Sequence, residues 1–322
     1  MLLLEIAFGF ALLFAGGEFL VRAAVALARH LRVSRALIGL TVVAFGTSLP
    51  EAFVSLKAAL IGAPGIAIGN VVGSNVANVL LVAGLGSVLA TVTFKRGLLK
   101  RDGLALVVAT VVFFGVATTG HIATPIAAIF LLSLIAYVVF SYRLERKDKD
   151  IADLHAREAA DIPDHRPPWQ SLLILVAGFA GILLGAELLI GGAIEAAELA
   201  GVSQAVIGLT LVALGTSLPE LAASAIAAWR GYGDVAMANI LGSCLFNICG
   251  VLGVVGLVAP LPVVDEIIHF DNWILLGVTL CFVLLTALGT RIPRAVGGLF
   301  LLAYAAYITL QFVGFSGVNA IG

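Results

Sequence analysis

Apolar residues run in long stretches along the chain, separated by short polar or charged segments. An α-helix needs about 17 to 25 apolar residues to cross the roughly 30 Å hydrocarbon core of a membrane. Ten stretches reach this length, and each predicts one membrane-spanning helix. They lie near residues 3–26, 37–60, 67–91, 103–119, 122–141, 170–194, 205–228, 235–260, 272–289 and 294–314.

The composition agrees with this pattern. The chain has 322 residues, of which 61% are hydrophobic and 11% charged, and its mean hydropathy is +1.14. These values exceed what a water-soluble domain of this length needs for one core, and they indicate an all-α polytopic membrane protein. The first apolar stretch lacks a basic leader, so we expect a retained helix there and not a signal peptide.

Positive charge is distributed unevenly between the two sides that these helices define. With the N-terminus placed outside, 17 of the 18 Lys and Arg residues fall on the cytoplasmic side, and only Lys57 falls on the other half. Because Lys and Arg are retained in cytoplasmic loops, we expect both termini outside and a cytoplasmic linker at 143–169. We expect Lys57 to extend to the outer interface.

The two halves of the chain repeat one another. A shift of 169 positions aligns 61 residues without a gap, from Glu18 on Glu187 to Asn78 on Asn247. Each half holds five predicted helices, and since five is odd, the second half must enter the membrane from the opposite side. The sequence therefore predicts two inverted five-helix repeats, 1–142 and 170–322, as in many secondary transporters.

A proline and a glutamate interrupt the second apolar stretch of each half. The segment GTSLPE ends at Glu51, and its copy ends at Glu220. Pro50 has no N–H, and its ring crowds the carbonyl group of Gly46, so the helix must kink or break between them. Carbonyl groups that lose their partners in this way are tolerated in a membrane only where they face protein or a polar cavity.

Each glutamate lies near the middle of its predicted span, where a charge costs about 2.5 to 3.5 kcal/mol on insertion scales. No Lys, Arg or His lies within four residues of either one, so another group must compensate them. The next helix of each half carries neutral oxygen ligands four residues apart, on one helix face. With the hydroxyl groups beside the prolines, the expected oxygen donors are Glu51, Glu220, Asn78, Asn247, Ser74, Ser243, Thr47, Thr216, Ser48 and Ser217.

A shell of oxygen ligands without sulfur or imidazole suits hard cations such as Ca²⁺. The sequence thus predicts a Ca²⁺ or Na⁺ site between two broken helices. Alternatively, the prolines only kink the helices and the glutamates are protonated and idle, an interpretation that the repetition in register disfavours. The three cysteines, Cys244, Cys249 and Cys281, indicate neither a disulfide nor a zinc site.

The paired motifs resemble the two alpha-repeats of the calcium/cation antiporter superfamily, and specifically of its sodium/calcium exchanger family. GTSLPE is followed by GNVVGSNVAN in the first half, and its copy is followed by ANILGSCLFN in the second. The resemblance covers nearly the whole chain. It implies a prokaryotic-type antiporter of the cell membrane that exchanges Na⁺ for Ca²⁺ by alternating access, with net movement of charge.

The resemblance also completes the expected ion site. The family's ion-binding positions, carried over by motif, add Ala44 and Ala213, which would contribute backbone carbonyl groups. Potassium-dependent exchangers have an aspartate at the position of Asn247, so its asparagine resembles the potassium-independent type. Proton/calcium exchangers usually carry an acidic residue in this motif, and neither 74–78 nor 243–247 contains one.

The sequence leaves a proton/calcium antiporter open, and more distantly a cation channel. A membrane serine hydrolase would need a histidine or lysine base near Ser48 or Ser217, and none is placed there, so no enzyme is expected. Neither a cofactor, nor nucleic acid, nor an obligate protein partner is implied, and the expected partners are Ca²⁺, Na⁺ and the lipid bilayer. Glu18 and Glu187 also correspond. Arg22 follows Glu18 by one turn, which favours structural pairing over ion binding.

Overall fold

The computed structural model describes residues 2–31, 33–90, 92–93, 100–147, 167–199, 213–289 and 291–319. Helices make up most of these residues, and some helical segments are π-helical, with the label η. The elements of the first half are α1 (Leu2–Leu31), α2 (Arg35–Ile38), η1 (Gly39–Val43), α3 (Ala44–Thr47), α4 (Leu49–Leu60), α5 (Pro64–Ala77), η2 (Asn78–Val82), α6 (Ala83–Leu89), β1 (Val92–Thr93), α7 (Lys100–Ala117), β2 (His121–Ile122) and α8 (Thr124–Lys147).

The second half repeats this order. Its elements are α10 (Pro168–Leu199), α12 (Ala213–Thr216), α13 (Leu218–Trp229), α14 (Gly233–Leu245), η4 (Phe246–Val251), α15 (Leu252–Val258), β3 (Leu261–Pro262), η5 (Ile267–Asp271), α16 (Asn272–Leu288), β4 (Arg291–Ile292) and α17 (Arg294–Asn319). The boundaries of α3, α4, α6 and β1 recur 169 residues later as those of α12, α13, α15 and β3.

Seven helices of the described chain are long and apolar enough to cross a membrane, and the bent pair formed by 35–47 and 49–60 raises this number to eight. The sequence predicts ten spans. α7 fails the test of composition because its first turn carries Lys100, Arg101 and Asp102. Part of the predicted span 205–228 lies outside the described residues. The protein is thus a polytopic helical membrane protein, and the number ten stays a prediction.

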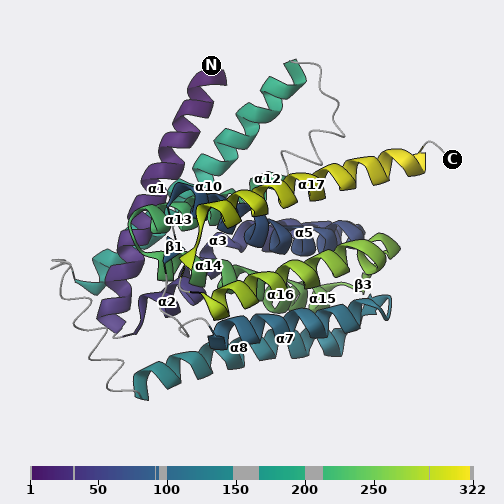
Figure 1. The fold of residues 1–322 in the computed structure, drawn as a ribbon, viewed down its shortest axis with the longest axis horizontal. Helices are drawn as coiled ribbons and strands as arrows, with labels where there is room; N and C mark the ends of the chain where they lie inside the picture. The colour runs from purple at the N-terminus through teal and green to yellow at the C-terminus, as the bar shows by residue number, and fades with distance from the viewer. Residues whose placement is uncertain are drawn as a thin grey trace.

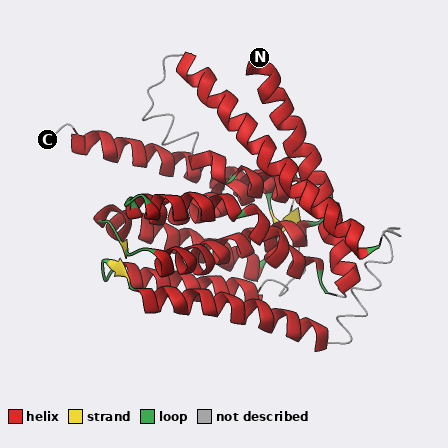
Figure 2. Ribbon diagram, turned by 180° about the vertical axis from the view of Figure 1, so that it is seen from behind, coloured by secondary structure: helices red, strands yellow, loops and turns green. Residues whose placement is uncertain are grey.

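α1 and α10 lie side by side and are inclined to the other helices (Figures 1 and 2). Glycines allow their backbones to touch. A Cβ atom on Gly16 would lie 2.6 Å from the backbone nitrogen of Ile182, and one on Gly178 would lie 2.7 Å from that of Leu20. Because no larger residue fits at these positions, the two helices pack by the close backbone approach common in membrane proteins.

The two halves exchange their strands. β1 pairs with β4, with Val92 opposite Ile292, and β2 pairs with β3, with His121 opposite Pro262. The two pairs lie well apart in the molecule (Figure 2). The adjoining helices cross over in the same way, because α6 packs against α17 and α15 against α8. The halves are therefore interlocked.

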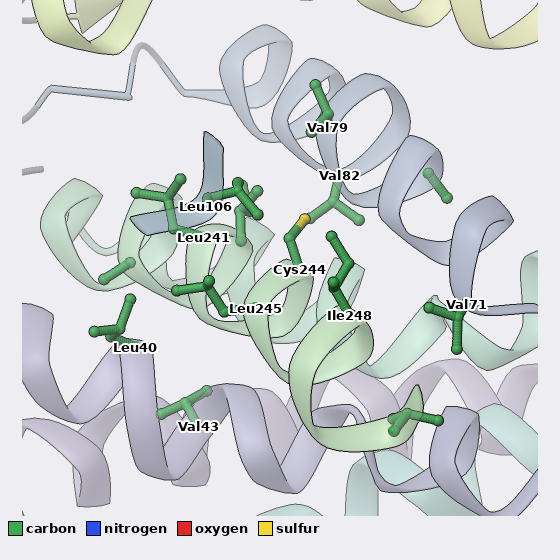
Figure 3. Packing of buried hydrophobic residues seen from close by; sticks show 14 of the residues in the cluster. Leu40, Val43, Val71, Val79, Val82, Leu106, Leu241, Cys244, Leu245 and Ile248 are labelled. Carbon is green, nitrogen blue, oxygen red and sulfur yellow. The ribbon is translucent and has the colours of Figure 1, made fainter. Parts of the chain in front are cut away.

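The most deeply buried element is α14, in which every residue except Asp234 is buried. Figure 3 shows Leu241 and Cys244 of α14 between Leu40 of η1 on one side and Val82 of η2 on the other. A helix that is surrounded by protein needs an apolar residue on every face, which explains the nearly continuous apolar sequence here. The few polar residues of this helix consequently point into the protein.

Ion pairs connect α1, α2, α13 and α14. Glu18 of α1 pairs with Arg22 and with Arg230, whose Nε lies 2.7 Å from the carboxylate of Glu18. Arg35 lies 3.2 Å from Asp234. The structural pairing expected of Glu18 is confirmed. Two further expectations concern side chains listed by exposure and bonding: Lys57 and Glu187 are exposed, and the three cysteines are free.

Candidate functional site

Both predicted helix breaks are present. α3 ends at Thr47 and α4 begins at Leu49, and Ser48 between them has φ −85° and ψ 5°, away from helical values. Ser217 separates α12 from α13 in the same way, with φ −88° and ψ 1°. The segments before and after Ser48 are bent by 42°. The prolines fall in the first turns of α4 and α13, where a missing N–H leaves no bond unmade.

The two glutamates lie in the first turns of α4 and α13, and both are wholly buried, with 0% exposure. The N-terminus of a helix carries a partial positive charge that stabilises a carboxylate. The break that Pro50 and Pro219 impose therefore does more than free carbonyl groups. It also creates a helix N-terminus under each glutamate.

The structure brings the two motifs together. The Ser48 hydroxyl donates a hydrogen bond to the carboxylate of Glu220 at 2.9 Å, although 172 residues separate them. The hydroxyl oxygens of Thr47 and Ser243 lie 3.5 Å apart at the same junction. Glu51 lies close enough to Glu220 for the two carboxylates to interact electrostatically. Two like charges at this distance inside a protein require a counter-charge.

The two asparagines of the motifs complete the junction. Asn78 begins η2, which packs against α13, and Asn247 lies in η4, which packs against α4. Each amide-bearing segment therefore contacts the glutamate-bearing helix of the other half. Both asparagines are 0% exposed. The crossing point of α5 and α14 lies nearby, where the Cys244 thiol donates to the Asn75 carbonyl at 3.9 Å.

Several polar atoms at this junction are buried without a hydrogen-bond partner. They are both carboxylate oxygens of Glu51, Oε2 of Glu220, the amide oxygen and nitrogen of Asn78 and of Asn247, and the hydroxyl of Ser217. Nearly all buried polar groups in proteins are paired, and each unpaired group costs about 1 to 3 kcal/mol. A cation would satisfy the oxygen atoms together, because it takes several oxygen ligands at once.

The remaining predicted members lie on the same elements. Ala44, Ser74 and Ser243 are buried, whereas Thr216 is half-buried at the end of α12. Ala213 begins α12. Within the described ranges, no group of three or more His, Cys, Asp and Glu side chains could hold a metal ion. The junction instead combines two carboxylates with neutral oxygen donors, a set that suits hard cations.

The π-helical segments were not predicted. η1 ends one residue before Ala44, η2 begins at Asn78, and η4 contains Asn247. A π-helical turn holds one more residue than an α-helical turn, and such turns occur frequently at functional sites. A sequence this uniformly apolar gives no hydrophobic period that would reveal the extra residue.

Two buried aspartates outside the junction were also missed. Asp102 accepts a hydrogen bond from the Tyr137 hydroxyl, and Asp271 accepts one from the Tyr307 hydroxyl at 3.0 Å. Asp102 is 3% exposed and Asp271 is 8% exposed. Their numbers differ by 169, so the contact is duplicated. The only sequence signal was this correspondence, since both residues lie at helix starts that read as interfacial.

Comparisons with known proteins agree with this geometry. The family model described as sodium/calcium exchanger protein matches residues 1–143 and 170–313. A putative antiporter, CaxA of Alkalimonas amylolytica, is 36% identical over 307 residues, which cover 94% of this chain and 96% of that protein. The sodium/calcium exchanger MaX1 of Methanosarcina acetivorans is 33% identical over 337 residues, with coverage of 94% and 96%.

Solved structures of the sodium-calcium exchanger NCX_Mj share the fold. The form soaked with zero Na⁺ and Ca²⁺ has a TM-score of 0.82 at 32% identity, and the match covers 96% of this chain and 98% of that chain. The form soaked with 10 mM Na⁺ and zero Ca²⁺ has a TM-score of 0.79 at 32% identity, with coverage of 96% and 99%. This chain belongs to the sodium/calcium exchanger protein family.

Proposed function

We propose that this protein exchanges Na⁺ for Ca²⁺ at one shared site between the two motifs. The observation that carries the proposal is the pair of wholly buried carboxylates, Glu51 and Glu220, among neutral polar groups without hydrogen-bond partners. Two carboxylates carry a charge of −2, which either one Ca²⁺ or two Na⁺ neutralise. The two ions would therefore compete for the same ligands. MaX1 and NCX_Mj, both sodium/calcium exchangers by name, support the same pair of ions.

The ligands divide by chemistry. In this proposal the glutamates supply the charge, the asparagine amides and the hydroxyl groups supply neutral oxygen atoms, and the alanines supply backbone carbonyl oxygens. An all-oxygen set of this size matches the six to eight ligands that Ca²⁺ prefers. The proposed ligands are Glu51, Glu220, Asn78, Asn247, Ser74, Ser243, Thr47, Thr216, Ser48, Ser217, Ala44 and Ala213.

The proposal includes alternating access in ten helices, arranged as two inverted repeats, 1–142 and 170–322. The recurrence of element boundaries at an offset of 169 residues supports this arrangement, as does the reciprocal exchange of strands. Inverted repeats allow a central site to open first to one side and then to the other. Both termini would lie outside the cell membrane, and the linker 143–169 would be cytoplasmic.

Sodium-driven uptake tests this function. We expect proteoliposomes loaded with Na⁺ and diluted into Na⁺-free buffer to accumulate Ca²⁺, because the outward Na⁺ gradient drives the exchange. A K⁺ gradient or a pH gradient alone should drive no uptake above that of protein-free vesicles. The measurement is the initial rate of ⁴⁵Ca²⁺ uptake. Uptake driven by pH alone would instead indicate a proton/calcium antiporter, and Ca²⁺ entry that needs no counter-ion would indicate a channel.

Asn247→Asp is expected to change the cation preference. The substitution adds a third carboxylate to the junction, and the extra negative charge should recruit K⁺ or a proton along with Ca²⁺. We expect the half-maximal Ca²⁺ concentration to change at least about tenfold, equivalent to ~1.4 kcal/mol, and to become dependent on K⁺ or pH. The matched control is Asn272→Asp, a buried asparagine of α16. Unchanged ion dependence of Asn247→Asp would remove Asn247 from the proposed ligands.

A further inference from the structure

An asparagine precedes the proposed serine ligand by one helical turn in each half. Asn70 lies four residues before Ser74 on α5, and Asn239 lies four residues before Ser243 on α14. Residues four apart share a helix face, so both asparagines continue the face that carries the ligands. Neither asparagine is among the proposed ligands.

Asn70 connects α5 to the helix that carries Glu51. Its Nδ2 lies 3.1 Å from the carbonyl oxygen of Glu51 and 2.9 Å from the hydroxyl of Ser55. The Ser55 hydroxyl in turn donates to the Ala67 carbonyl at 3.2 Å. The amide group of Asn70 thus holds the first turns of α4, the same turns that present the carboxylate.

The second half contains the same contact. Nδ2 of Asn239 lies 2.9 Å from the hydroxyl of Ser224, and both residues are 1% exposed. Asn239 and Ser224 are the counterparts of Asn70 and Ser55, since each number differs by 169. A hydrogen bond between the carboxylate helix and the ligand helix is therefore present at both copies of the junction.

The surroundings of this contact explain why it matters. α4 and α5 form a hairpin whose tight turn contains Gly62, with φ +79°, and Gly231, with φ +80°, lies in the matching turn between α13 and α14. The neighbouring residues Ala58, Ala59 and Ala67 are small and apolar. Packing between such residues does not by itself fix how far one membrane helix slides along another, whereas a hydrogen bond is directional.

We propose that Asn70 and Asn239 are positioning residues, which fix the register between each glutamate and the serine and asparagine ligands on the next helix. This inference rests on the proposed function, because it presupposes an ion site at the junction. Neither asparagine touches the ion. Loss of a group that orients a metal ligand typically lowers metal affinity about 10- to 100-fold, and we expect an effect of that size here.

Ca²⁺ binding to the purified full chain tests the proposal. We expect Asn70→Ala and Asn239→Ala each to raise the Kd for Ca²⁺, measured by calorimetry in Na⁺-free detergent solution, by about tenfold or more. The matched control is Asn272→Ala, which removes a buried amide bond between α16 and α7, 3.2 Å from Nδ2 of Asn272 to the Phe114 carbonyl. This control should keep the Kd of the unaltered protein. In vesicles, the asparagine variants should raise the KM for Ca²⁺ more than they lower the maximal rate.

Variants of Ser55 separate positioning from general stability. Ser55→Ala removes the hydroxyl that Asn70 holds, so Ser55→Ala and Asn70→Ala together should raise the Kd no further than Asn70→Ala alone, whereas Ser55→Thr should restore it. Equal Kd values for Asn70→Ala, Ser55→Ala and Asn272→Ala would overturn the positioning role. If Asn70→Ala does not fold, Ser55→Ala decides alone. Failure of the unaltered protein to bind Ca²⁺ would be a different result, because it would refute the proposed function itself.

Discussion

Replacing Glu51 or Glu220 with glutamine is expected to abolish Ca²⁺ exchange. Each glutamate supplies half of the −2 charge that balances Ca²⁺, and both are wholly buried. Removing one partner of a buried charge pair costs about 3 to 5 kcal/mol, which is roughly two to four decades in affinity. The glutamine amide keeps the size of the side chain, so the loss would come from charge and not from packing.

The matched control is Glu187→Gln, the same substitution at an exposed position of α10. Its sodium-driven ⁴⁵Ca²⁺ uptake should equal that of the unaltered protein. In ion-free detergent, Glu51→Gln should melt at a temperature no lower than the unaltered protein, because the substitution relieves the interaction between two buried carboxylates. Exchange at near-normal rates by either Glu51→Gln or Glu220→Gln would show that the residue does not bind the transported ions.

Exchange is also expected to be electrogenic, with three Na⁺ for each Ca²⁺. A tenfold Na⁺ gradient supplies about 1.4 kcal/mol per ion, so two Na⁺ could sustain only about two decades of Ca²⁺ gradient. Three Na⁺, with one net charge crossing 100 mV for about 2.3 kcal/mol, supply roughly 6.5 kcal/mol and sustain between four and five decades. The hydroxyl and amide groups around the two glutamates offer ligands for ions beyond the two that the carboxylates neutralise.

The reversal voltage distinguishes these stoichiometries. The voltage of the vesicles is clamped with K⁺ and valinomycin while sodium-driven Ca²⁺ flux is measured. A tenfold change in Na⁺ on one side corresponds to about 59 mV for one charge. With three Na⁺ per Ca²⁺, the reversal voltage should therefore move by about 180 mV. A flux whose reversal does not depend on voltage would mean that two Na⁺ are exchanged, and the electrogenic prediction would be wrong.

The parts of the site that depend on local chemistry could be predicted from the sequence. The break at Ser48 follows from the proline two residues later, and the burial of Glu51 follows from the apolar residues around it. The repeat indicated that the two motifs meet. It did not indicate that the Ser48 hydroxyl bonds to Glu220, because this choice depends on how two helices from different halves rotate against each other.

Other features depend on contacts that no local pattern encodes. The tyrosine partners of Asp102 and Asp271 lie on different helices, 35 and 36 residues further along the chain. A charged residue at the start of a helix has the same sequence pattern whether it meets water or a buried tyrosine. Asn70 was recognised only as part of the repeat, because its role depends on the distance to Glu51 across the hairpin.

The exchanged strands determine when the protein can be completed during synthesis on the ribosome. Val92 of β1 pairs with Ile292, and His121 of β2 pairs with Pro262, so the partners emerge 200 and 141 residues later. At about 5 to 20 residues per second, the first strands wait roughly 7 to 40 s. During this time their backbone groups and the face of α8 that meets α15 lack their final neighbours. A nascent chain that stops after residue 142 is therefore an unfinished molecule, although it contains one whole copy of the repeated sequence.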